Sequence, residues 1–237
     1  DYPFGWAFYG VGQLRHDNNA GGENYGKKFK KYGTLGVFLD MNKGIMSFSL
    51  DKEYPVTYLE FRGVGQSAEV YLNDSYLGRH DGGYSTFRFD ISDKLKEENL
   101  LFVRCDNGKN EIVYPQMADF TFYGGIYRDV YLLQCKEAHF DLDDHGSSGV
   151  IVTPKLNNHQ ADVKVQAWCK GGKEIEFSIG DLKVKVPVNH GYGKAEFVID
   201  DPHLWDGLKD PYLYELKAFL LEDDEICDEV NVRFGIR

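Results

Sequence analysis

The feature that most constrains the fold is a series of short segments near the C-terminus in which apolar and polar residues alternate. Seven segments show this pattern: 150–154, 161–168, 173–179, 182–186, 194–199, 213–220 and 228–234. Alternation with a period of two is typical of a β-strand with one buried face. Seven short strands of this kind predict an immunoglobulin-like β-sandwich, which we place at residues 141–237.

The middle of the chain shows the same alternation, which predicts strands in 56–62, 69–72, 87–91 and 100–104. Between them, Ser92–Leu95 could form a single helical turn capped by Ser92. Aromatic residues make up 15% of the chain, it contains 26 glycines, and helical periodicity is scarce. Together these features predict an all-β protein.

The N-terminal part contains a predicted β-hairpin. Two apolar runs, Leu35–Asp40 and Ile45–Leu50, flank the short loop Met41–Gly44. Such a hairpin cannot bury a core alone, so we expect it to pair with the strands that follow. The residues that we expect it to bury are Val37, Leu39, Met46 and Phe48. The lysine-rich run at 27–31 is interpreted as a solvated face rather than a site for phosphate or an acidic partner.

Residues 1–52 resemble the middle of a SPRY domain, a β-sandwich used in protein–protein recognition. The resemblance is carried by Gly5-Trp6, Gly10, Gly12, His16, Tyr25-Gly26, Phe29, Gly36-Val37, Leu39-Asp40, Gly44 and Ser47-Phe48-Ser49. It implies a protein partner bound through residues 1–52. Two other interpretations of the chain stay open. It is either a natural or constructed hybrid of two kinds of domain, or a β-sandwich scaffold without catalytic activity.

Composition and cysteine usage limit the classes of function. A net charge of −11 argues against a nucleic-acid partner, whose binding protein would be basic. No apolar run approaches the roughly 20 residues that a membrane span requires. A chain that starts at Asp1 without methionine is expected to be a processed or cut product. The four cysteines are widely spaced and predict buried free thiols, which favour a reducing compartment.

Two polar clusters resemble reactive sites but have simpler interpretations. Adjacent residues of a strand point to opposite faces, so His80 and Asp81 are not expected to cooperate as acid and base; with Gly82-Gly83 they predict a polar turn. The acidic stretch 137–149 lacks the spacing of a calcium loop and is interpreted as a linker. We therefore predict no metal site and no cofactor.

The stretch Asp119–Val130 carries the strongest functional signal. It combines four aromatic residues, two adjacent glycines, an arginine and two carboxylates. The aromatics favour an extended backbone that the glycines interrupt, and the residues from Ile126 onward predict a strand. Exposed rings beside a carboxylate suit a sugar, because rings cover its C–H faces and carboxylates accept hydrogen bonds from its hydroxyls.

This stretch also resembles the signature of the sugar-binding domain of glycoside hydrolase family 2. The shared residues are Asp119-Phe120, Tyr123, Gly125-Ile126 and Arg128, supported by 58–73, 78–91, 202–205, 210–214 and 234–237. The resemblance covers about residues 54–237. It implies a jelly-roll-type β-sandwich at 53–140 before the immunoglobulin-like domain, with residues 1–52 docked on it.

The same resemblance assigns candidate roles. Asp119 would reach toward the active site of a separate catalytic barrel, and the candidate substrate-binding residues are Asp119, Phe120, Tyr123 and Arg128. The expected partners are a terminal β-linked sugar and that barrel. Two glutamates of the barrel would perform the retaining reaction, so we expect no catalytic residue among these 237. Trp205 is interpreted as a plug of the sandwich end rather than a sugar platform.

Overall fold

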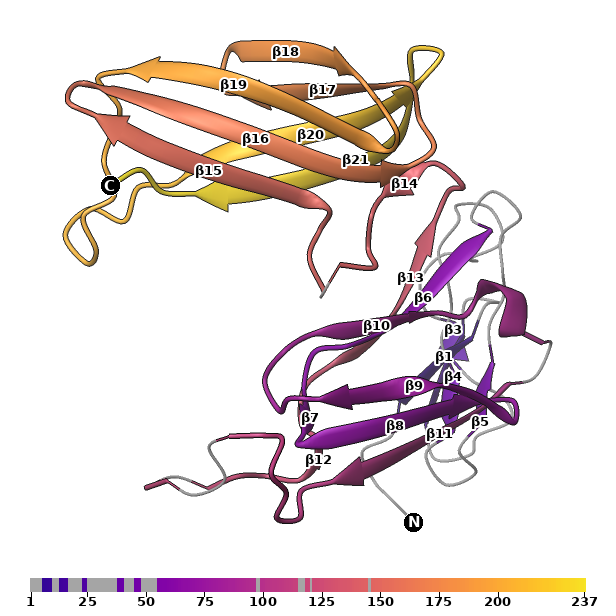
Figure 1. The fold of residues 1–237 in the computed structure, drawn as a ribbon. Helices are drawn as coiled ribbons and strands as arrows, with labels where there is room; N and C mark the ends of the chain where they lie inside the picture. The colour runs from indigo at the N-terminus through magenta and orange to yellow at the C-terminus, as the bar shows by residue number, and fades with distance from the viewer. Residues whose placement is uncertain are drawn as a thin grey trace. The chain divides into compact units, whose positions relative to one another are not determined.

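The computed structural model describes residues 6–9, 13–16, 23–24, 38–40, 45–47, 55–96, 99–114, 118–119, 121–144 and 146–237, and before residue 55 it describes the backbone alone. The chain forms two compact units, Asp1–Gln134 and Cys135–Arg237. Each unit is built from strands (Figure 1). Among the described segments, none has the helical length and apolarity required to cross a membrane.

The first unit begins with two small groups of strands. A three-stranded antiparallel sheet contains β1 (Trp6–Tyr9), β2 (Gln13–His16) and β3 (Glu23–Asn24). The predicted hairpin is confirmed, because β4 (Phe38–Asp40) pairs with β5 (Ile45–Ser47).

The hairpin also joins the larger sheet, as expected. Leu100 of β11 (Asn99–Asp106) pairs with Ile45 of β5. The expected burial of Val37, Leu39, Met46 and Phe48 lies outside the side chains that the structure describes.

Two sheets form the body of the first unit. One has the order β4-β5-β11-β8-β9, with β8 at Ser67–Leu72 and β9 at Ser75–Asp81. The other has the order β10-β6-β13, with β6 at Val56–Phe61, β10 at Phe87–Asp90 and β13 at Val130–Cys135. The short strands β7 (Val64–Gly65) and β12 (Gly125–Ile126) pair separately. The core contains Leu59, Phe61, Val64, Ala68, Val70, Leu72, Phe87 and Ile91.

Strand β6 differs from the one-sided strand that its alternation predicts. Tyr58, Leu59, Glu60 and Phe61 are all at most 1% exposed, so both faces of the strand are buried. The polar face is tolerated because the Glu60 carboxylate lies 2.5 Å from Arg88 Nε and 2.6 Å from Arg62 Nε. A buried carboxylate is stable only when charged donors satisfy it in this way.

The predicted turn after β10 is present, but its cap is not the predicted one. Ser92–Lys94 form a short 3-10 turn in which Ser92 is the first residue rather than the cap. The Ser92 hydroxyl instead accepts a hydrogen bond from the Thr57 backbone N–H at 2.9 Å and donates to Asp90 Oδ1 at 2.5 Å. Ser92 therefore ties the turn to β6.

The second unit is a sandwich, and all seven segments predicted for it are strands. They are β15 (Val150–Asn157), β16 (Gln160–Lys170), β17 (Glu174–Ile179), β18 (Leu182–Pro187), β19 (Tyr192–Asp200), β20 (Tyr214–Glu222) and β21 (Glu225–Phe234). One sheet joins β15, β19 and the short β14 (His139–Phe140) to β16, and the other has the order β18-β17-β20-β21.

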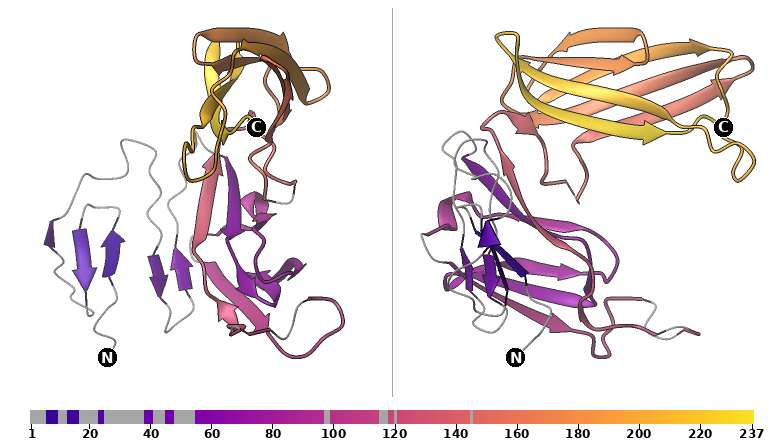
Figure 2. Two further views of the ribbon diagram at one scale, coloured as in Figure 1. Left: turned by 90° about the vertical axis from the view of Figure 1, so that its left-hand side faces the viewer. Right: turned by 180° about the vertical axis from the view of Figure 1, so that it is seen from behind.

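The two sheets of this unit face each other across an apolar core (Figures 1 and 2). Along β16, residues alternate between exposed and buried, with Val163 and Val165 fully buried. Ile175, Phe177, Leu216 and Leu220 fill the core from the opposite sheet. The alternation in the sequence is thus the pattern of a sheet with one face in the core.

Two smaller features can be compared with the expectations from the sequence. None of the four cysteines forms a disulfide, as expected, but Cys169 alone is buried and the others are half-buried. Trp205 lies at the end of the second sandwich. Its backbone N–H donates to Ile236 O at 2.8 Å, and a Cβ atom at Gly235 would lie 3.0 Å from Trp205 Cβ. Trp205 is 36% exposed, and its interpretation as a plug stays a prediction.

Candidate functional site

The stretch Asp119–Val130 is held in place by a close approach of two backbones. Gly125 pairs with Gly65, and Ile126 pairs with Val64. A Cβ atom at Gly65 would lie 2.2 Å from the Tyr123 carbonyl oxygen, well inside contact distance. Glycine is therefore required at position 65 for Tyr123 to reach this position.

Two side chains then attach the loop between β9 and β10 to the same stretch. The Tyr127 hydroxyl donates a hydrogen bond to the Gly83 carbonyl. Arg128 Nη1 donates to the Tyr84 carbonyl at 3.0 Å and to the Arg62 carbonyl at 3.4 Å, and the guanidinium lies over the Tyr127 ring. Arg128 is thus engaged in positioning three segments of backbone.

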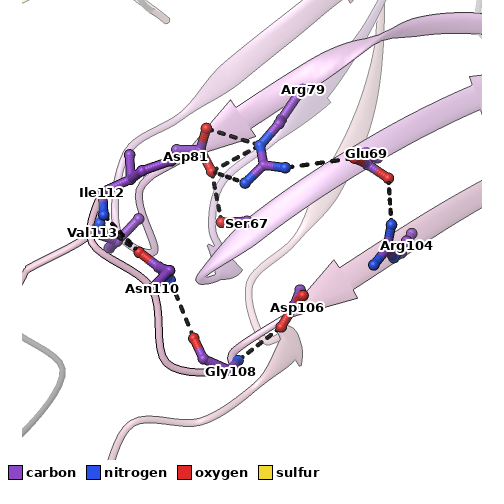
Figure 3. A network of polar contacts seen from close by, with 10 residues as sticks. All are labelled: Ser67, Glu69, Arg79, Asp81, Arg104, Asp106, Gly108, Asn110, Ile112 and Val113. Atoms are coloured by element: carbon purple, nitrogen blue, oxygen red, sulfur yellow. Dashed lines mark hydrogen bonds and ion pairs between the residues drawn. The ribbon is translucent and has the colours of Figure 1, made fainter.

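A third segment, the loop after β11, is stabilised by its own polar side chains (Figure 3). Asp106 Oδ1 accepts a hydrogen bond from the Gly108 N–H at 2.8 Å. Asn110 Oδ1 accepts from the N–H groups of Ile112 and Val113 at 2.9 and 2.8 Å. Local bonds of this type replace the ladder of a strand, and they give Val113 a defined position.

Polar residues on β8 and β9 form a separate network beside this loop (Figure 3). Asp81 accepts hydrogen bonds from Arg79 and, at 2.6 Å, from the Ser67 hydroxyl. The hydrogen bond from Arg79 is the main cause that lowers the pKa of Asp81.

His80 faces other groups. It stacks on Phe87 with ring centroids 4.2 Å apart, its Nε2 lies 2.9 Å from the Ser85 hydroxyl, and burial lowers its pKa. His80 and Asp81 thus have separate partners, in keeping with the expectation that they do not cooperate. Gly82 has a φ of +144°, which suits glycine and the predicted turn.

These three segments, together with Gly65 and Gln66, surround a cavity of about 170 Å³. Its lining residues are Gly65, Gln66, Gly83, Tyr84, Val113, Thr121, Phe122, Tyr123 and Tyr127. Tyr84 and Tyr123 are 54% and 71% exposed, so their rings form a rim that solvent reaches. Gln66 is 6% exposed, and its Oε1 is buried without a hydrogen-bond partner among the described residues. Walls that are mainly apolar and aromatic are a common composition for a small-molecule site.

Of the residues predicted for sugar contact, the structure places one on the wall of this cavity. Tyr123 lines it, and Arg128 follows Tyr127. Asp119 is exposed and precedes the cavity residue Thr121 by two positions. No ion pair links Asp119 to Arg128 or to another described residue. Phe120 lies outside the described residues.

Sequence reasoning missed the residues that complete the cavity. Gln66 and Tyr84 come from segments far from Asp119 in the sequence, whereas Val113 lies in the loop that leads into the motif. Their loops are joined to the stretch by backbone pairing and by Tyr127 and Arg128. The pair Gly82-Gly83 before Tyr84 was a partial signal, because it marked a tight turn. Within the part of the chain that is described, no group of three His, Cys, Asp or Glu side chains could hold a metal ion.

Comparison with known proteins gives two family matches. Residues 44–136 match the model described as glycosyl hydrolases family 2, sugar binding domain, and residues 138–237 match glycosyl hydrolases family 2. The first match includes β5, so this hairpin strand falls within the sugar-binding domain. Neither match supports the resemblance of residues 1–52 to a SPRY domain.

Individual relatives agree with these matches. The chain is 32% identical over 207 residues to a beta-glucuronidase of Bacteroides fragilis, covering 76% of this chain and 28% of that protein. It is 30% identical over 212 residues to a beta-galactosidase of Thermoanaerobacter pseudethanolicus, covering 80% and 27%. The solved structure of an FMN-binding beta-glucuronidase from Facaelibacterium prausnitzii L2-6 superposes with a TM-score of 0.70 at 31% identity, covering 77% of this chain and 30% of that one. The chain thus spans less than a third of the length of these relatives.

Proposed function

Because the chain belongs to glycosyl hydrolase family 2, we propose that it is the carbohydrate-contacting N-terminal region of a β-glycosidase. The substrate class would be a terminal β-linked sugar, since the relatives named above are β-glucuronidases and β-galactosidases. The reaction would be carried out together with catalytic residues that other parts of the protein provide. The chain would contribute one wall of the active site through Asp119, Phe120, Tyr123 and Arg128.

The observation that carries this proposal is the exposed carboxylate of Asp119 in the matched sugar-binding domain. It has no hydrogen bond or ion pair among the described residues, so its oxygens remain available. A carboxylate can accept hydrogen bonds from two neighbouring hydroxyls of a sugar, and bonds to an ionised acceptor are stronger than neutral ones.

The aromatic residue Tyr123 supports the same role. Its ring is 71% exposed, while its carbonyl is fixed against Gly65. A ring held by a fixed backbone can cover the apolar face of a sugar at little entropic cost. Arg128 would act mainly by holding the Arg62 and Tyr84 carbonyls.

The test is Asp119→Ala in the complete protein, measured as kcat/KM on chromogenic β-glucuronides and β-galactosides. Losing charge-assisted hydrogen bonds to the substrate should cost about 2 kcal/mol or more, or roughly 30-fold in kcat/KM. Asp181→Ala is the matched control, because Asp181 is an exposed aspartate in the turn between β17 and β18. Unchanged kinetics combined with a lowered melting temperature would show that Asp119 is structural.

A further inference from the structure

The outer face of the sheet formed by β9, β8 and β11 carries three rows of side chains that run across the strands. The core of the unit lies on the opposite face, where Ala68, Val70 and Leu72 of β8 are buried. Along β11, exposed residues alternate with less exposed ones, as in a strand with one free face. The register places Tyr76, Tyr71 and Phe102 in the first row, Arg79, Glu69 and Arg104 in the second, and Asp81, Ser67 and Asp106 in the third.

The first row is aromatic and leaves much of its apolar surface open to solvent. Tyr76 and Phe102 each expose more than half of their surface, and so does Leu100, two positions before Phe102 on β11. The Tyr71 ring lies between its neighbours, with its centroid 5.0 Å from that of Tyr76 and 5.8 Å from that of Phe102. Contiguous exposed apolar groups with a polar rim are a mark of an interaction surface.

The second and third rows carry opposite charges. Arg79 and Arg104 share the single carboxylate of Glu69, at 3.5 and 3.1 Å, so the second row stays positive. The third row contains two aspartates and the neutral Ser67, so it is negative. Most of the Arg104 side chain is exposed. Asp106 is also exposed and uses one oxygen for the Gly108 N–H, and a carboxylate can accept several more hydrogen bonds.

A further apolar group lies beyond the row of aspartates. Figure 3 shows Ile112 past Asp81, on the side away from Arg79. Ile112 is mostly exposed, and its N–H donates to Asn110 Oδ1 at 2.9 Å, which fixes the backbone there. Along the strands, the order of the surface is therefore apolar, basic, acidic and apolar.

This order is complementary to itself. Neighbouring rows are about 7 Å apart, because they are two strand residues apart. A twofold axis in the plane of the contact, running across the strands between the basic and acidic rows, reverses the order along the strands and keeps the order across them. Arg104 of each copy then faces Asp106 of the other, and each aromatic row faces the loop that carries Ile112. A twofold contact uses the same patch on both copies in this way.

We propose that this face is a contact between two copies of this chain, related by a twofold axis. A second copy fits better than an unrelated protein, because the charges and apolar groups that match this face all lie on the face itself. With strands about 4.8 Å apart and a rise of about 3.4 Å per residue, the face from Leu100 to Asp106 measures roughly 15 by 20 Å. Standard interfaces bury about 800 Å² on each partner, so this dimer is weak, with a Kd on the order of 10–100 µM. The inference does not depend on the proposed sugar contact.

The first experiment is sedimentation velocity of the chain over a range of about 1–300 µM. The average sedimentation coefficient should rise with concentration from the value of a monomer toward that of a dimer. Phe102→Ser should raise the Kd at least about tenfold, because a twofold dimer loses the apolar contact of this ring twice. Val198→Ser is the matched control, at an exposed valine of β19 in the second unit, and should leave the Kd unchanged. A chain that stays monomeric throughout, or a dimer that Phe102→Ser does not weaken, would overturn the proposal.

The second experiment tests whether the basic and acidic rows face each other. Arg104→Asp alone and Asp106→Arg alone each create two contacts between like charges, so each variant should associate at least about tenfold more weakly. An equal mixture of the two variants should dimerise again, because both contacts of the mixed dimer then join opposite charges. Lys155→Asp, at an exposed position of β15, controls for the change in net charge.

Melting temperatures should show that every variant is folded, including Asp106→Arg, which loses the hydrogen bond from the Gly108 N–H. A mixture that associates no better than its two components would overturn the twofold arrangement.

Discussion

Replacing Glu60 should destabilise the first unit far more than replacing an exposed glutamate. Glu60 is 1% exposed, and its two carboxylate oxygens contact Arg62 and Arg88 separately. Glu60→Gln keeps the shape of the side chain but removes its charge, so it creates no cavity. The Arg88 side chain is 10% exposed and loses this carboxylate in a poorly solvated position.

The two ion pairs contribute unequally to the expected loss. The Arg62 side chain is 53% exposed, so its pair should be worth under about 1 kcal/mol. Breaking a buried ion pair typically costs about 3–5 kcal/mol. For a unit of about 134 residues, such a loss corresponds to a melting temperature lower by roughly 10–18 °C.

Differential scanning calorimetry provides the assay, because the transition of the second unit serves as an internal reference. Only the transition of the first unit should move, and Glu111→Gln, at an exposed position of the same unit, should leave it in place. The double substitution Glu60→Leu with Arg88→Met should recover most of the lost stability, since apolar groups can replace a buried pair. A decrease below about 3 °C for Glu60→Gln would refute the argument that this pair is energetically buried.

Three further outcomes are expected. Burial lowers the pKa of His80 in the folded state, so the unfolded chain binds the proton more tightly. The first unit should therefore lose stability as the pH falls from about 6.5 through the folded pKa. In thermal melts, His80→Leu should flatten this pH dependence. Burial raises the pKa of the Cys169 thiol to about 11, so mass spectrometry after iodoacetamide treatment at neutral pH should show Cys169 alkylated after the other cysteines. Limited proteolysis should cut the acidic connection 141–149, next to the proposed domain boundary, before the interior of β16; early cleavage within 161–168 would count against two separate domains.

For strands with one buried face, both the strand and its burial could be predicted from the sequence, whereas for β6 the strand could be predicted but the burial of its second face could not. The second unit followed the alternation strand by strand, because each strand there has a core side and a solvent side. In β6 the same alternation was misleading: Glu60 reads as a solvent-facing residue, yet Arg88 from β10 pairs with it inside the unit. The burial of Glu60 thus depends on Arg88, which is distant from it in the sequence.

The residues of the candidate site likewise fall into those that the sequence could predict and those that it could not. Tyr123, Arg128 and Asp119 belong to one continuous motif and could be singled out together. Gln66 and Tyr84 could not, since they reach the cavity through the pairing of Gly65 with Gly125 and through the bonds that Tyr127 and Arg128 make to the loop between β9 and β10. No local pattern encodes such a juxtaposition.

The order of strands in the smaller sheet of the first unit has a consequence for synthesis on the ribosome. Strand β6 lies between β10 and β13, and the Arg62 N–H just after it donates to Asp129 O just before β13. At a translation rate of about 5–20 residues per second, β6 leaves the ribosome several seconds before β13 does. During that interval one edge of an apolar strand stays open to other nascent chains. Translation that stops before Val130 should therefore leave a fragment prone to aggregation, whereas no two paired strands of the second unit are as far apart in the sequence as β6 and β13.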